Sequence, residues 1–392
     1  MNIKKSLLAL AVATVASSTY AATVTVVLTG STAFRSIVQD RVPTLLSGLQ
    51  TVTTASGNTY RTYMGTMASL PGDTVVIKMS FNGSVEGIDA LNNSTALTVL
   101  PDVTYTGSGT STATPTASAQ GDLAFSDVFP STAGRSSAKF AGENKLGVVP
   151  YVFARAPITS GAGNIAANIS NLTQRQASQL YSTAGNTSLS YFTGNAADTD
   201  VLYLVGRYSL SGTRATVESV IYNSALYGNW YLDSRDSTPH QFGDDPTYEK
   251  GATLQPGGVP AYALDNGGGV SGFVGGGDLK THLTTFPNAI GYLGIADVGS
   301  NVKINYEGVT ESQANVASGA YSLWSYEHAY YKTPAQSGPT GSKLTVVTAI
   351  INAIKSNAYQ TDNTKVYFTT GFVPLSTMTV ERNVDGGPIS PL

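Results

Sequence analysis

The 392-residue chain contains no cysteine. It therefore cannot form a disulfide, a thiol nucleophile, a cysteine-ligated metal site or a lipid anchor on an N-terminal cysteine. Charged residues are also scarce, at 12% of the chain, which is about half the usual share. The formal net charge is −3 and no block of basic residues occurs, so we expect no nucleic-acid partner.

Histidine is equally rare, and the three histidines, His240, His282 and His328, lie far apart in the sequence. They show neither metal-ligand spacing nor a place beside a serine nucleophile, so we expect no metal, no cofactor and no catalytic residues. The glycine run over residues 267–277 resembles a nucleotide-binding loop, but no clear strand precedes it and no acidic partner follows it. The chain is therefore not expected to be an enzyme.

The first 22 residues predict a cleavable secretory signal. Lys4 and Lys5 precede an apolar run over residues 7–16, and small residues follow as far as Ala21 and Ala22. The run is shorter than the roughly 20 residues that span a bilayer, and no second long apolar segment follows. We expect a periplasmic or secreted protein that does not span a membrane. Removing the two lysines changes the net charge from −3 to −5.

The remaining residues, roughly 370, suit two lobes of ordinary size. Apolar, β-branched runs alternate with segments of helical periodicity, which predicts an α/β fold with mainly parallel sheets. Residues 93–120 have a weak pattern and predict an exposed loop or loose hairpin. The expected strands cover residues 22–30, 74–81, 122–126, 147–154, 201–206, 289–295 and 365–368. The expected helices cover residues 85–91, 171–180, 214–222, 279–286 and 344–356, with another beginning near residue 33.

Four expected strands end in short turns of serine, threonine, glycine or aspartate. These turns are Gly30-Ser31-Thr32, Gly83-Ser84, Ser126-Asp127 and Ser211-Gly212-Thr213. Ligands of open α/β sheets bind beyond the carboxyl ends of the strands. Helix N-termini offer unpaired N–H groups there, and hydroxyl groups add donors, so the four turns together predict an anion site. Each turn alone is more often an ordinary helix cap.

The four turns, in this order, resemble those of the phosphate-binding proteins of bacterial ABC importers, a branch of the type 2 periplasmic binding proteins. The resemblance runs from about Thr25 to Tyr331, around poorly matching insertions at 43–73, 93–120 and 223–274. It implies a two-lobed fold with a ligand cleft, lobe I comprising residues 23–152 and 296–392 and lobe II residues 153–295. The motifs that carry it are LTGSTAF (28–34), SFNGSVEGI (80–88), GDLAFSD (121–127) and RYSLSGT (207–213).

The resemblance also implies roles for individual residues. Arg207 would supply the formal positive charge. Asp127 would accept a hydrogen bond from the proton that phosphate carries and sulfate lacks, which favours phosphate. The alternative is that Asp127 caps a following helix. The implied phosphate-binding residues are Ser31, Thr32, Ser84, Ser126, Asp127, Arg207, Ser211, Gly212 and Thr213.

The function implied is that of a monomeric extracytoplasmic receptor, which passes inorganic phosphate to an ABC importer permease in the inner membrane. The large insertions, the missing lipid anchor and two departures from the family's pattern, at Ser209 and Glu86, leave alternatives open. The ligand would then be another oxyanion or a phosphorylated compound. Alternatively, the chain would be a secreted surface or adhesion-type protein that keeps the fold without the transport role.

Overall fold

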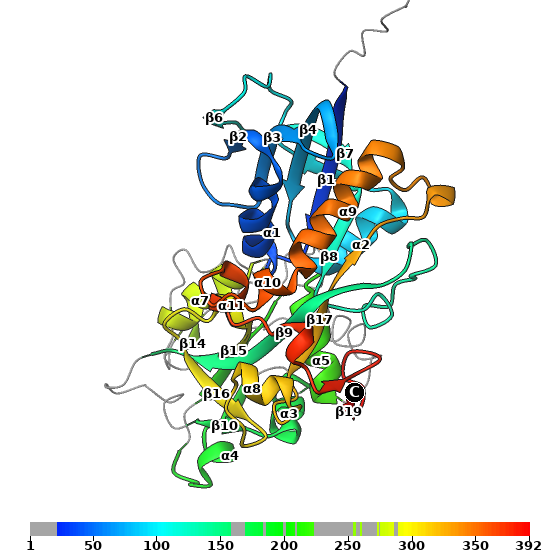
Figure 1. The fold of residues 1–392 in the computed structure, drawn as a ribbon. Helices are drawn as coiled ribbons and strands as arrows, with labels where there is room; N and C mark the ends of the chain where they lie inside the picture. Colours follow the sequence, from blue (N-terminus) through cyan, green and yellow to red (C-terminus); the bar gives the residue numbers. More distant parts are fainter. Residues whose placement is uncertain are drawn as a thin grey trace, which may run out of the picture.

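The computed structural model describes residues 22–157, 169–182, 186–198, 201–207, 210–222, 254–255, 259–260, 273, 275–285 and 289–392. The predicted signal segment, apart from residue 22, and Ser209 lie outside these residues. The described chain is elongated, with an upper and a lower lobe in the view of Figure 1. Within the described ranges, no helix combines the length and the apolar character needed to cross a bilayer.

The upper lobe is built on β1 (Thr23–Gly30), whose neighbours β4 and β8 both run parallel to it. Beyond β4, the insertion at 43–73 forms an antiparallel hairpin that widens the sheet. The sequence did not predict these strands. In spatial order this half of the sheet comprises β8 (Leu123–Ser126), β1, β4 (Leu70–Ser80), β3 (Tyr60–Met67), β2 (Ser47–Thr53) and β6 (Gly109–Thr112).

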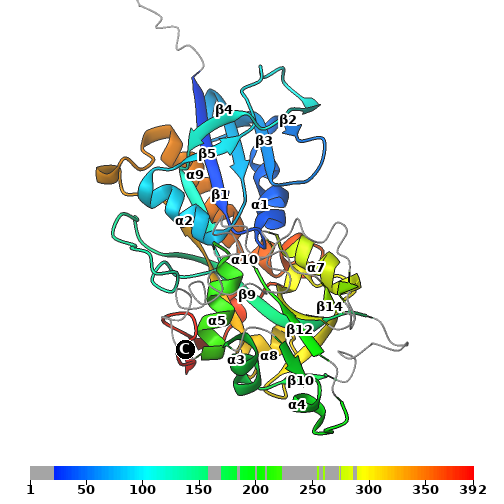
Figure 2. The same ribbon diagram turned by 180° about the vertical axis from the view of Figure 1, so that it is seen from behind.

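Side chains alternate between the two faces of β1, and each face is covered by helices. Val26 and Leu28 pack in the main core with Ile37 of α1 and Val347 of α9. Val27 faces the other way and packs against Ala90 of α2. Figure 2 shows α2 on the face opposite to that seen in Figure 1. The helices of this lobe are α1 (Arg35–Arg41), α2 (Ser84–Asn93), α9 (Gly341–Lys355), α10 (Asn357–Gln360) and α11 (Val366–Thr369).

The long strand β9 (Asn144–Arg155) joins the two lobes. It pairs with β17 (Trp324–Tyr330) as far as Pro150, and with β15 (Ala289–Gly294) from Tyr151 onward. Its change of partner falls where the family resemblance implies the first crossing between lobes. The strand β16 (Val302–Tyr306) also pairs with the lower end of β9, so residues on both sides of position 296 share the lower part of the sheet. The lobe boundaries stay a prediction.

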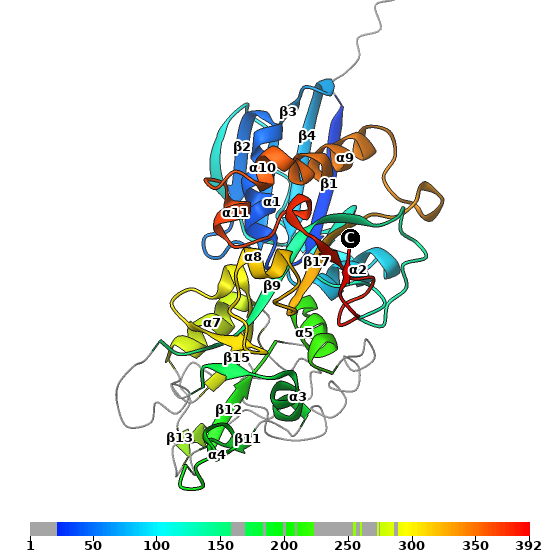
Figure 3. The same ribbon diagram turned by 60° about the horizontal axis from the view of Figure 1, so that its bottom comes forward.

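The lower lobe, clearest in Figure 3, surrounds β15 with strands and helices. Its strand β12 runs parallel to β15. The remaining elements are β10 (Asn171–Leu172), β11 (Asn186–Ser188), β12 (Val201–Val205), α3 (Gln174–Ser182), α4 (Ser190–Thr193), α5 (Gly212–Tyr222), α7 (Gly276–Thr285) and α8 (Gln313–Ala317). Short pairs and turns complete the described chain: β5 (Ala96–Val99) with β7 (Ala117–Gln120), β13 (Leu254–Gln255) with β14 (Val259–Pro260), β18 (Val380–Glu381) with β19 (Ser390–Pro391), and the 3-10 turns η1 (Val42–Leu45), η3 (Ile295–Asp297), η4 (Pro334–Gln336) and η5 (Leu375–Thr377).

The α/β class is confirmed, and the sheet is mixed. Parallel pairs lie where the predicted turns are, at β1–β4, β1–β8 and β12–β15, while β9 and β17 add antiparallel pairs. One predicted strand is wrong, because residues 365–368 fall almost entirely in the helix α11. A short apolar run does not distinguish strand from helix. Here tertiary packing decides, since Tyr367 is buried directly over Gly147, where a Cβ would lie 1.7 Å from its hydroxyl.

Candidate functional site

The first turn ends β1 and brings it unusually close to β8. Gly30 has φ +115°, and a Cβ there would lie 1.9 Å from the Phe125 carbonyl oxygen, so the position requires glycine. The Ser31 amide donates to that carbonyl at 2.8 Å. The buried Ser31 hydroxyl accepts the Phe34 amide at 3.3 Å. Thr32, the next residue, presents its hydroxyl to the lower lobe, where it accepts Arg207 Nη2 at 3.3 Å.

The second and third turns meet through Ser84 and Asp127. Ser84 opens α2, and its hydroxyl donates to Asp127 Oδ1 while accepting the Asp127 amide at 3.3 Å. Residues 127–143, all of which are described, contain no helix. The alternative that Asp127 caps a following helix is therefore wrong, because its carboxylate faces Ser84 instead. The Ser126 hydroxyl donates to the Val128 carbonyl at 2.8 Å within a local turn.

The fourth turn brings the N-terminus of α5 from the lower lobe onto the same carboxylate. The Thr213 hydroxyl donates to Asp127 Oδ2 at 3.1 Å, and the Ser211 hydroxyl accepts the Arg214 amide at 3.3 Å as a helix cap. A Cβ at Gly212 would lie 1.9 Å from Asp127 Oδ1 and 2.6 Å from the Ser84 hydroxyl. Only glycine allows this approach. Figure 2 shows α5 lying directly below α2.

Arg207 is fully buried between the lobes, with 1% of its surface exposed. Its backbone amide donates to the Tyr292 hydroxyl at 3.1 Å, and its Nε donates to the Phe273 carbonyl at 3.0 Å. These contacts fix the guanidinium in the lower lobe, from which Nη2 reaches Thr32 in the upper lobe. A planar guanidinium held in this way is suited to bidentate contact with an oxyanion.

The interior around Asp127 is acidic. Burial raises the pKa of Asp127, while the Ser84 hydrogen bond and the positive charge of Arg207 act in the opposite direction. Glu327 is also fully buried, on β17. Burial, together with the charge of Asp127, raises the pKa of Glu327 well above its ordinary value. Both effects favour the protonated, uncharged form of Glu327.

The nine residues predicted from the sequence lie in and around the junction between the lobes. Ser84, Asp127, Gly212 and Thr213 are in direct contact, and Thr32 pairs with Arg207. Ser31, Ser126 and Ser211 use their hydroxyls within their own turns. The sequence did not point to the residues that hold the Asp127 carbonyl, because they lie away from the strand-to-helix turns. These are Tyr151 at 3.1 Å, Thr216 at 3.0 Å and Ser325 at 2.6 Å.

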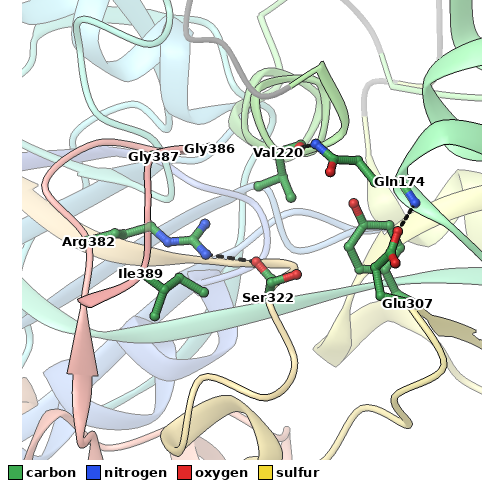
Figure 4. A pocket seen from close by; sticks show the side chains of 9 residues that line it. Gln174, Val220, Glu307, Ser322, Arg382, Gly386, Gly387 and Ile389 are labelled. Carbon is green, nitrogen blue, oxygen red and sulfur yellow. Dashed lines mark hydrogen bonds between the residues drawn. The ribbon is translucent and has the colours of Figure 1, made fainter. Parts of the chain in front are cut away.

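Among the cavities of the described residues, one adjoins the junction between the lobes and another lies away from it. One, of about 290 Å³, adjoins the junction, and its walls include Thr32, Arg35, Asn82 and Asp297. Another, of about 230 Å³, lies in the lower lobe by the C-terminal segment and has Arg382 at one end and Glu307 at the other (Figure 4). None of the four turns contributes to the second cavity.

Comparison with known proteins finds similarity to phosphate-binding proteins. No family model matches the chain. Over 129 residues, 32% of this chain, it is 26% identical to the phosphate-binding protein PstS of Bacillus subtilis (strain 168). The aligned part spans 39% of that relative's length.

Solved structures with similar chains include the following three. A putative phosphate ABC transporter substrate-binding protein with bound phosphate, from Clostridium perfringens, has 15% identity and a TM-score of 0.47, over 90% of this chain and 99% of its own. An ABC-type phosphate transport receptor from Vibrio cholerae has 14% identity and a TM-score of 0.46, over 89% and 99%. PstS from Borrelia burgdorferi has 13% identity and a TM-score of 0.40, over 90% and 98%.

Proposed function

We propose that the protein is an extracytoplasmic receptor that binds inorganic phosphate at the junction between its two lobes. The observation that carries the proposal is the convergence of Ser84 from the upper lobe and Thr213 from the lower lobe on the buried Asp127, with Arg207 close by. Two hydroxyl donors, a helix N-terminus, a guanidinium and one acceptor are the groups that a protonated oxyanion requires.

Binding would exchange one set of hydrogen bonds for another. The Ser84 and Thr213 hydroxyls, which donate to Asp127 in this structure, would turn to the oxygens of phosphate. Asp127 would then accept a hydrogen bond from the P–OH of phosphate, and Arg207 would balance the negative charge. Sulfate brings no proton, so an ionised Asp127 would face it without a hydrogen bond, at a cost in free energy.

The similarity to PstS of Bacillus subtilis supports this ligand, since that relative is a phosphate-binding protein. By the same resemblance, the receptor would be an exported monomer that delivers phosphate to an ABC importer permease, and it would not be an enzyme. The nine residues predicted from the sequence would form the phosphate site, and the lobes would close on the ligand by a hinge motion around β9.

Isothermal titration calorimetry with inorganic phosphate tests the proposal. The protein is refolded or extensively dialysed first to remove bound anion. We expect saturable 1:1 binding of phosphate, with sulfate competing much more weakly. The absence of phosphate binding in a folded, ligand-free sample would refute the proposed function.

A further inference from the structure

The cavity of about 290 Å³ beside the junction has one residue, Thr32, in common with the proposed phosphate site. Thr32 and Arg35 come from the first turn and the helix that follows it. Phe81 and Asn82 immediately precede the second turn, which carries Ser84. The opposite wall is the start of α7, together with Asp297. Thr32 lies between the cavity and the four turns, because its hydroxyl also accepts Arg207 Nη2 at 3.3 Å.

The cavity is larger than inorganic phosphate needs. At about 30 Å³ for each water molecule in the liquid, its volume corresponds to roughly ten waters, whereas phosphate has only five heavy atoms. The donors proposed to hold phosphate, Ser84 and Thr213, do not line the cavity. A compact organic group attached to the phosphate would have this space available.

The walls are polar and carry charges of both signs. Arg35 Nε is buried and has no hydrogen-bond partner among the described residues. Asp297 lies opposite, and burial raises its pKa, against the opposing positive charges of Arg207 and Arg35. Asp278 and Asn82 add a second carboxylate and an amide. Hydroxyl groups of a ligand could bind all of these side chains, because a hydroxyl donates to a carboxylate and accepts from an amide or a guanidinium.

The start of α7 is shaped around Asp297. A Cβ at Gly276 would lie 1.9 Å from Asp297 Oδ2, so glycine is needed for the helix to reach this carboxylate. At Gly277, in contrast, an added Cβ would meet nothing within 4 Å. The two aspartates disfavour a second phosphate or a carboxylate in the cavity, and the volume is at the lower limit of small-molecule pockets. These features exclude nucleotides and favour a small, neutral, hydroxyl-bearing group.

We propose that the preferred ligand is a phosphate monoester of a small polyol or sugar. Its phosphate, as the monoanion that keeps one P–OH to donate to Asp127, would occupy the four turns, and its hydroxyl groups would bind Arg35, Asp297 and Asn82 in the adjoining cavity. This inference rests on the proposed phosphate site and adds the class of ligand to it.

Calorimetry at about pH 6, near the second pKa of a phosphate monoester, tests the inference with three ligands: inorganic phosphate, glycerol 3-phosphate and glucose 6-phosphate. We expect at least one monoester to bind about tenfold or more tightly than inorganic phosphate, the effect of one hydrogen bond to a charged group. Arg35→Gln should abolish this preference and leave the affinity for inorganic phosphate within about twofold. Arg175→Gln, which removes the same charge from an exposed position on α3, is the control.

A second variant, Gly277→Leu, fills the cavity without removing a polar group. It should weaken monoester binding and spare inorganic phosphate, and it serves if Arg35→Gln does not fold. The inference about the ligand class would be overturned if inorganic phosphate bound as tightly as both monoesters. It would also be overturned if both variants weakened the binding of all three ligands equally. In either case the proposed phosphate site itself would stand. If none of the three ligands binds the wild-type protein, the proposed phosphate site fails together with it.

Discussion

Replacing Asp127 with asparagine isolates the feature on which selectivity for phosphate depends. The two side chains have nearly the same shape, and the Asp127 carbonyl keeps its contacts with Tyr151, Thr216 and Ser325. The change replaces one acceptor oxygen with an N–H donor. Ser84 and Thr213, which each donate to a different carboxylate oxygen, can no longer both do so without one hydroxyl rotating.

The expected change in affinity follows from the free energy of one hydrogen bond to a charged group. Losing the acceptor for the phosphate proton should cost about 1.5–3 kcal/mol, which corresponds to about 10- to 150-fold weaker binding. Sulfate, which has no proton, should gain about tenfold because the opposing carboxylate charge is removed. The ratio of phosphate to sulfate affinity should therefore fall by about a hundredfold or more.

The same substitution changes how stability depends on pH. Burial raises the pKa of Asp127 above its ordinary value of 3.8. Its contribution to stability is therefore fully present below pH 3.8 and is lost as pH rises through the higher pKa of the folded state. Asp127→Asn removes this loss. In phosphate-free buffer, the melting temperature of the variant relative to wild type should rise with pH across that window.

Calorimetry gives the two affinities and differential scanning fluorimetry gives the melting temperatures. Asp362→Asn is the matched control, since it removes the same charge at the surface, where the Asp362 side chain accepts hydrogen bonds from the Thr364 amide and hydroxyl. A phosphate-to-sulfate ratio that stays within about twofold of wild type in Asp127→Asn would refute the role assigned to Asp127.

Three further predictions concern other parts of the junction. Arg207→Lys keeps the charge and loses the planar fork, so phosphate affinity in calorimetry should fall about tenfold or more. Gly212→Ala places a Cβ 1.9 Å from Asp127 Oδ1, which should abolish phosphate binding and lower stability by about 1–3 kcal/mol in denaturant unfolding. Burial raises the pKa of Asp385 from 3.8 to about 7, so its contribution to wild-type stability should fall as pH rises from about 4 to about 7, and Asp385→Asn should flatten that profile in thermal melts.

The sequence predicted the parts of the fold that local patterns control. The apolar strand before Gly30 and the helices after Ser84 and Ser211 were predicted because alternation and capping act over a few residues. The hairpin of β2 and β3 was not predicted, because its strands are stabilised by pairing with β4. The helix at Val366–Thr369 was mistaken for a strand, since the burial of Tyr367 depends on Gly147, far away in the sequence.

The candidate site divides in the same way. Residues on strand-to-helix turns, such as Ser84 and Thr213, carry a local signal. Tyr151, Ser325 and Glu327 lie within strands, where nothing in the neighbouring sequence distinguishes them from core residues. Their position beside Asp127 follows from the order of β9, β17 and β8 in the sheet, which sequence patterns do not determine.

The acidity of the chain and its proposed affinity for an anion are compatible because of how the junction is built. Burial and the charge of Asp127 raise the pKa of Glu327, which favours its uncharged form, and the carboxylate in contact with the site hydroxyls is Asp127. In this structure Asp127 already satisfies the hydroxyls of Ser84 and Thr213 across the lobes. When phosphate binds, the two hydroxyls would exchange their hydrogen bonds to Asp127 for hydrogen bonds to phosphate. The total number of hydrogen bonds would hardly change, so this exchange contributes little to affinity. Selectivity would then depend on the proton shared with Asp127, and it should weaken as pH falls and Asp127 itself becomes protonated. Sulfate competition measured between pH 5 and 8 should accordingly increase toward the acid end.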